Sequence, residues 1–229
     1  MVDTRKVTAA AIGALMLAAS GSAAATFQGE FWDVTASPGA GDPASDKIDT
    51  LGDVLSIVEG SDARAPDATF KSTGIDYPQG PQGPGATSDT LADWLGTDSA
   101  SLSGSSGVSM LGSIFRFTGS IFLDAGTNNL SVGSDDGYRL SIGGSVVNSV
   151  DATRPFSTDS FTYTNSGAAG ATPFELIFYE DNQVAVGVEF KKDGQIAAPV
   201  PVPAAGIMLM TALGGLGGAA GLRRRRKTA

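Results

Sequence analysis

Apolar residues alternate with small or polar ones through the second half of the chain, in short runs broken by Gly, Asn and Asp. A period of two is that of a half-buried strand, which turns one face toward a core. The runs are Phe115–Phe117, Ile121–Leu123, Leu130–Val132, Tyr138–Ile142, Phe161–Tyr163, Phe174–Tyr179 and Val184–Phe190. Gly143-Gly144 predicts a hairpin, because both residues can take positive φ. Short strands at this spacing predict an antiparallel β-sandwich.

The first half is less regular. Thr26–Val34 is typical of an opening strand, and Ser45–Gly60 carries apolar residues at helical spacing, with Ser45 as the expected N-cap. Thr87–Leu95 is a second, shorter helical candidate. The predicted fold class is therefore all-β, with one or two short helices in the N-terminal half. We expect one domain over 26–196, because a half-sized sheet would leave its edges open.

The N-terminal end has the pattern of a signal peptide. Arg5 and Lys6 precede the apolar stretch Val7–Ala19, and Ala23–Ala25 offers small residues to signal peptidase. Residues 1–25 are the predicted leader, with an uncleaved start as the alternative. The protein is therefore expected to be exported.

The C-terminal end, 197–229, has three parts. The proline segment Val200–Ala204 precedes the apolar run Ala205–Leu222 and the basic cluster Arg223–Lys227. A helix through the apolar run would reach roughly 27 Å, enough to cross a thin bilayer. The basic cluster would stay on the cytoplasmic side. This pattern predicts a transmembrane helix that tethers the chain.

This tail resembles the PEP-CTERM class of bacterial sorting signals in its Val-Pro-Leu-Pro-Ala variant, with Val202 in place of the leucine. The resemblance implies a membrane tether that an exosortase-type processing protease cuts near the proline motif. It also implies a bacterium that makes exopolysaccharide, and a final location at the cell surface or in the extracellular matrix. A retained single-span anchor is the alternative.

Composition narrows the chemistry. The net charge is −9 although both ends are basic, so the body between them is strongly acidic. Such a body disfavours nucleic acid and anionic membranes as partners, and favours divalent cations. Without any His or Cys, the chain has no Ser-His-Asp or Cys-His system and no usual zinc set. A glycosidase would need two carboxyl groups about 5–9.5 Å apart across a cleft. The acids of this chain are scattered through predicted turns, so we expect that the protein is not an enzyme.

Two adjacent acids lie between predicted strands, in Ser134-Asp135-Asp136-Gly137-Tyr138. In a regular strand their side chains would point to opposite faces, so joint action needs a turn or an unusual peptide geometry. A second acidic segment ends the apolar strand Phe174–Asp181. The alternative is a turn in which one carboxylate caps backbone N–H groups and the other is solvated.

The segment Phe115–Phe190 resembles the lectin-like β-sandwich of the anthrax protective-antigen domain, a family that includes flocculin adhesins. The resemblance implies a cis peptide and a shared Ca²⁺ with Asp135 and Asp136 as paired ligands. Asp181 would supply a further side-chain oxygen, with a carbonyl from Asn182 or Gln183. Waters or sugar hydroxyls would complete the six to eight oxygens that calcium needs.

The predicted function is that of a non-enzymatic surface or biofilm-matrix protein with calcium-dependent carbohydrate binding, its partner an exopolysaccharide or another glycan. Asp135, Asp136, Asp181 and Asn182 are the predicted carbohydrate-binding residues, and the first three also the metal ligands. The alternative is a structural matrix protein with the same sandwich and no sugar site. Trp32 and Trp94 are expected in the core rather than as sugar-stacking platforms.

Overall fold

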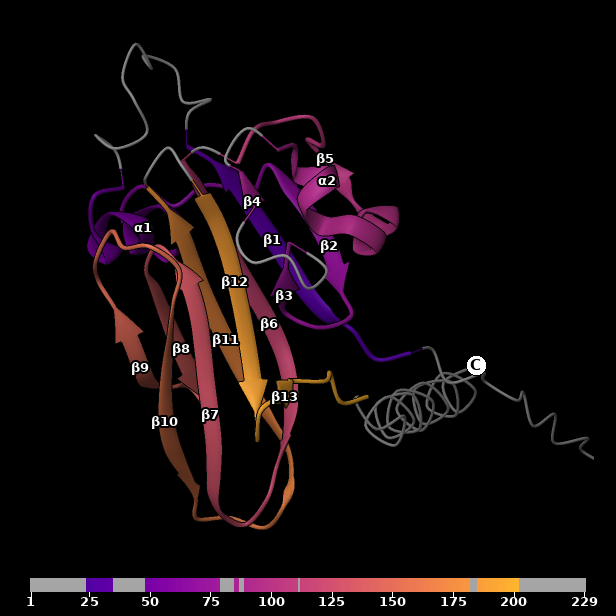
Figure 1. The fold of residues 1–229 in the computed structure, drawn as a ribbon, viewed down its shortest axis with the longest axis vertical. Coiled ribbons are helices and arrows are strands. Elements are labelled where there is room, and N and C mark those ends of the chain that lie inside the picture. The colour runs from indigo at the N-terminus through magenta and orange to yellow at the C-terminus, as the bar shows by residue number, and fades with distance from the viewer. Residues whose placement is uncertain are drawn as a thin grey trace, which may run out of the picture.

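Two antiparallel β-sheets pack face to face in the computed structural model (Figure 1). The structure describes residues 24–34, 48–78, 85–86, 89–110, 112–181 and 185–201. The all-β sandwich that the alternation predicts is confirmed. Most of the predicted leader and the tail from residue 202 onward lie outside the described residues.

The larger sheet has seven strands in the order β5-β2-β1-β6-β11-β8-β9. Their bounds are β1 Phe27–Asp33, β2 Ala68–Ser72, β5 Ser103–Gly104, β6 Ser113–Leu123, β8 Tyr138–Ile142, β9 Ser145–Val150 and β11 Gly170–Glu180. Strands from both halves of the chain meet in this sheet, because β1 pairs with β6 along six residues.

The smaller sheet has six strands, and β12 lies at its centre. The bounds are β3 Asp76–Tyr77, β4 Gly85–Ala86, β7 Gly126–Asp135, β10 Ser157–Asn165, β12 Ala185–Lys192 and β13 Gln195–Ile196. One edge of β12 pairs with β7, and β4, β3 and β13 share the other edge in turn.

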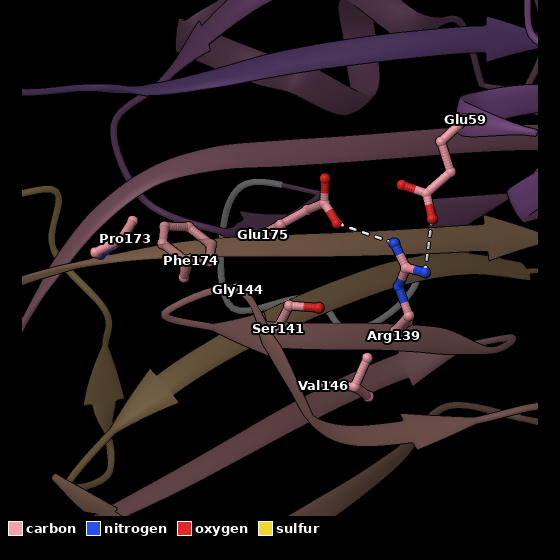
Figure 2. Close-up of a pocket in the computed structure, with 8 residues that line it drawn as sticks. All are labelled: Glu59, Arg139, Ser141, Gly144, Val146, Pro173, Phe174 and Glu175. Atoms are coloured by element: carbon pink, nitrogen blue, oxygen red, sulfur yellow. Dashed lines mark hydrogen bonds and ion pairs between the residues drawn. The ribbon is translucent and has the colours of Figure 1, made fainter. Parts of the chain in front are cut away.

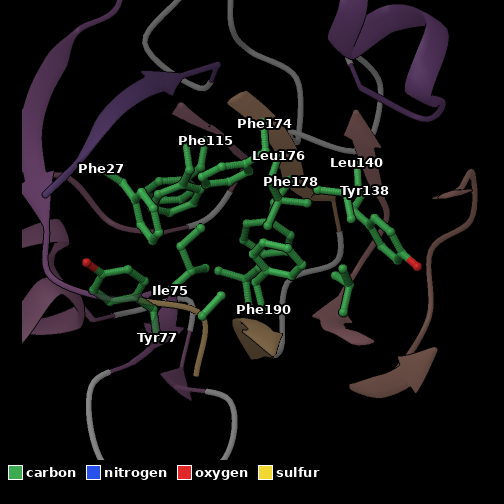
Figure 3. Close-up of a cluster of buried hydrophobic side chains, with 14 of the residues drawn as sticks. Phe27, Ile75, Tyr77, Phe115, Tyr138, Leu140, Phe174, Leu176, Phe178 and Phe190 are labelled. Atoms are coloured by element: carbon green, nitrogen blue, oxygen red, sulfur yellow. The ribbon is translucent and has the colours of Figure 1, made fainter. Parts of the chain in front are cut away.

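An aromatic core fills the space between the two sheets (Figure 3). Phe115 of β6 and Phe178 of β11 lie side by side in the larger sheet, with ring centroids 5.9 Å apart, and Phe190 of the smaller sheet lies 5.4 Å from the ring of Phe174. These side chains are the inward-facing members of the alternating runs. Trp94 and Trp32 are both 1 % exposed, so their expected place in the core is confirmed.

Helix α1 (Leu51–Glu59) covers part of the outer face of the larger sheet. Its buried Val54 and Val58 pack in one cluster with Ile177 and Tyr179 of β11. Residues 176 and 178 of the same strand face the opposite way, into the main core. Burial on both faces explains why β11 is apolar without interruption from Leu176 to Tyr179.

Several predicted boundaries differ from the structure. Helix α1 begins after Thr50, not Ser45, because the Thr50 side chain and Asp53 form a reciprocal capping box. The second helical segment is α2 (Leu91–Leu95), followed by a 3₁₀ helix, η2 (Gly96–Ser101). No described helix is long and apolar enough to span a membrane.

Two predicted strands, Phe115–Phe117 and Ile121–Leu123, are one continuous strand, β6. Gly119 lies inside this strand without ending it. A Cβ at position 119 would lie only 2.7 Å from the Phe27 ring, so glycine is there to allow this close approach and not to form a turn. The hairpin at Gly143-Gly144 is confirmed, with φ of 60° and 81°.

Candidate metal and ligand site

Three buried carboxylates meet where β7 and β11 end, one strand from each sheet. Asp135 is the last residue of β7, Glu180 is the last of β11, and Asp136 follows Asp135. One carboxylate oxygen from each lies within 4.8 Å of the others. Their exposed fractions are 3 % for Asp135 and 0 % for the other two. The acidic cluster thus lies between the layers at one end of the sandwich.

The turn after β7 brings the two aspartates to one site. The peptide bond between Asp135 and Asp136 is cis, which agrees with the unusual peptide geometry that joint action requires. The turn is paired to β11, because the Asp136 N–H donates to the Tyr179 carbonyl and the Tyr179 N–H donates to the Gly137 carbonyl, both at 3.1 Å.

A loop before β10, residues 153–156, wraps the acidic cluster. The Arg154 N–H donates to Asp136 Oδ1 at 2.7 Å, and the Phe156 N–H donates to Asp135 Oδ2 at 3.0 Å. The Thr153 hydroxyl donates to Asp181 Oδ2 at 2.8 Å. These three donors orient the carboxylates, yet they neutralise no negative charge.

Asp181 lies beside the cluster, as predicted. Its N–H donates to Asp136 Oδ2 at 2.8 Å, and the residue is 6 % exposed. Burial raises the pKa of Asp181, against the lowering effect of the Thr153 hydrogen bond, and the charge of Asp136 raises it further. The structure therefore brings together Asp135, Asp136 and Asp181, whereas Asn182 lies outside the described residues.

Glu180 is the member of the cluster that sequence reasoning missed. Among the described residues, neither of its carboxylate oxygens has a hydrogen-bond partner. Burial, and then the charges of Asp136, Asp135 and Asp181, raise the pKa of Glu180 to about 11. A carboxyl group in this position either keeps its proton or shares a cation with its neighbours.

A signal for Glu180 is present in the sequence. Phe174, Leu176 and Phe178 are the inward-facing positions of β11, and Glu180 continues the same alternation. An acid at a core-facing position is costly unless it has a partner. The predicted turn-cap alternative is met in part: both aspartates accept backbone N–H groups, but both are buried rather than solvated.

The Arg154 side chain is engaged within the protein. It forms an ion pair with Asp159 at 2.7 Å and donates to Ser134 Oγ at 2.8 Å. Its guanidinium also lies over the Tyr138 ring, 5.8 Å from the centroid. We infer that Arg154 supports the loop and the turn, rather than offering an uncommitted positive charge to a ligand.

A separate hollow of about 450 Å³ lies at β8 and β11 (Figure 2). Its cation, Arg139, is paired with Glu59 at 2.8 Å and with Glu175 at 3.0 Å. Because two carboxylates flank this guanidinium, the hollow offers no excess positive charge to an anion. None of its lining residues belongs to the acidic cluster.

Comparison with solved structures agrees with the fold. The PA14 domain of the antifreeze protein MpAFP is 24 % identical, with a TM-score of 0.57 over 76 % of this chain and 85 % of that one. A PA14 sugar-binding domain from an RTX adhesin is 25 % identical, with a TM-score of 0.56 over 78 % and 96 %. No protein-family model and no curated protein matches this chain. The chain is thus similar to PA14 domains in its fold, an all-β sandwich of the lectin-like type.

Proposed function

We propose that this chain is a non-enzymatic, exported glycan-binding protein whose acidic cluster holds Ca²⁺. The observation that carries the proposal is the buried group Asp135, Asp136 and Glu180, with oxygens within 4.8 Å of one another. Calcium prefers carboxylate oxygens and tolerates irregular geometry. A divalent cation would offset the mutual repulsion of these acids and the cost of their burial.

Sugar binding is supported by the position of the acidic cluster at one end of the sandwich, where β7 and β11 end. The similar fold of a PA14 sugar-binding domain also supports it. A calcium ion held by these three side chains would still lack ligands, and sugar hydroxyls are suitable oxygens.

The proposal includes the tail. Export by the leader, tethering through Ala205–Leu222, and release by a processing protease near Val200–Ala204 would deliver the sandwich to an exopolysaccharide layer. The alternative is a structural matrix protein with the same fold, in which the aspartates serve the turn alone. The hydrogen bonds that Asp135 and Asp136 accept from backbone N–H groups favour that alternative.

A glycan array with and without calcium tests the binding function. We expect binding to at least one class of glycan in millimolar calcium, lost in chelator and in the double variant Asp135→Asn, Asp136→Asn. Asp98→Asn is the matched control. Asp98 is also a buried aspartate, but it accepts hydrogen bonds from Thr73 and Tyr77, away from the site. Absence of calcium-dependent binding to every glycan would favour the structural alternative.

A further inference from the structure

The C-terminal arm, residues 197–201, is held on the sandwich before the chain leaves it. Pro199 forms a bridge with Ile121, and the Val200 N–H donates to the Ser120 carbonyl at 2.9 Å. This part of β6 is available because β1 pairs with it only as far as Thr118. The position of the chain is therefore fixed up to Val200, the first residue of the proline segment.

An apolar hollow lies beside this exit. Its volume is about 210 Å³, and its lining consists of Ile121, Phe122, Lys192, Ile196, Ala197 and Ala198. Phe122 is 48 % exposed. Among the large hydrophobic residues that the structure describes, only Val146 is also exposed. Lys192 is paired with Asp124 and Asp193, so the character of the hollow is apolar rather than cationic.

The predicted membrane span begins close to this point. Only three residues, 202–204, separate Pro201 from Ala205. At about 3.6 Å per residue, the four peptide links between these two residues reach at most about 14 Å. A tail inserted in a bilayer must therefore hold the exit of the sandwich near the lipid surface.

We propose that the face around Phe122 rests on the lipid surface while the tail is inserted. This inference depends on the membrane tether of the proposed function, and not on sugar binding. A half-exposed aromatic ring suits the boundary between headgroups and acyl chains. The short linker is the reason for choosing a bilayer, rather than another protein, as the partner of this face.

The same geometry keeps the acidic cluster away from the membrane. Across β6 and β11, Ser113 pairs with Glu180 and Ile121 pairs with Thr172. Eight residue steps along β6 thus separate the two ends, about 26 Å at 3.3 Å per step. Figure 1 shows β7 and β11 ending at the upper end of the sandwich, while β13 lies toward the lower end. A tethered sandwich would thus present its ligand site to the surroundings.

Nitroxide quenching in vesicles tests this contact with the full chain. The chain has no cysteine, so Phe122→Cys and Ala152→Cys each carry one fluorophore. Ala152 is an exposed residue next to Thr153, at the far end. The vesicles are phosphatidylcholine with a nitroxide on the headgroup. We expect loss of fluorescence at position 122 and none at position 152.

Two further variants sharpen the test. Val146→Cys controls for exposure, because Val146 is also an exposed apolar residue, on β9 three strands from β6. An insertion of about ten Gly and Ser residues between Val202 and Pro203 raises the fully extended reach of the linker from about 14 Å to about 50 Å. We expect this insertion to restore the fluorescence at position 122 to the level at position 146.

The outcomes separate the inference from the tether. Full chains that float with the vesicles but show equal quenching at positions 122, 146 and 152 would overturn the contact and leave the tether intact. Quenching at position 122 that survives the insertion would overturn the argument from linker length. Failure of the full chain to float with vesicles would overturn both the tether and the contact, and the glycan array would still judge sugar binding.

Discussion

Gly137 lies next to the acidic cluster, and no larger residue fits at this position unless neighbouring atoms move. A Cβ there would lie 2.5 Å from the Tyr179 ring, which is fully buried under α1. We expect Gly137→Ala to lower the free energy of unfolding by about 1–3 kcal/mol, the usual cost of overpacking. Urea denaturation measures this. Gly170→Ala is the control, because no atom lies within 4 Å of a Cβ there; equal effects of the two changes would contradict the packing argument.

Glu180 makes the calcium-free protein sensitive to pH. Its folded pKa of about 11 is above the ordinary value of 4.5, so between these values the folded state keeps a proton that the unfolded state loses. Stability should therefore fall as pH rises through this window. In chelator, urea midpoints at pH 5, 7 and 9 should fall less steeply for Glu180→Gln than for the wild type. Equal dependence of the urea midpoint on pH in the wild type and in Glu180→Gln would show that ionisation of Glu180 is not what destabilises the protein at high pH.

At the scale of elements, local sequence patterns predict where the strands lie, but they do not predict contacts between residues far apart in the sequence. The runs Leu130–Val132 and Phe161–Tyr163 follow period two because one face of each strand is turned toward the core, and the sequence shows this directly. The continuity of β6 is not visible in the local pattern, because the side chain that fills the space at Gly119 belongs to Phe27, far away in sequence.

The same distinction applies to the site. The Asp135-Asp136 pair is visible as a motif, whereas the loop 153–156 reaches it from 18 to 21 residues away through backbone N–H groups. Backbone donors have no signature in side-chain pattern. Glu180 could have been found, since its inward position follows from the alternation of β11.

Helix α1 depends on its N-cap. The Thr50 side chain accepts the Asp53 N–H, and the Asp53 carboxylate accepts the Thr50 N–H. Thr50→Ala should cost about 1 kcal/mol, a loss of about 2–4 °C in melting temperature for a domain of this size. Thr162→Ala, at an exposed position of β10, is the control, with an expected effect within about 0.5 kcal/mol. Equal melting temperatures would show that the cap contributes little.

For the whole molecule, the tail predicts processing. The sandwich holds the chain up to Val200, and the predicted cleavage segment Val200–Ala204 follows directly. Intact-mass measurement of protein released from the producing cells should show chains that lack Arg223–Lys227. Full-length chains in the medium would refute processing. Recovery in membranes alone would favour a permanent anchor.

The central claim is that the acidic cluster binds calcium. A ligand that binds only the folded state at a hundredfold excess over Kd stabilises it by about 2.7 kcal/mol, which is about 5–10 °C in melting temperature for a domain of this size. The most direct measurement is the melting temperature in millimolar calcium and in chelator, for the wild type and for Asp135→Asn with Asp136→Asn. The account predicts a rise for the wild type and none for the double variant. Equal wild-type melting temperatures in calcium and in chelator would contradict it.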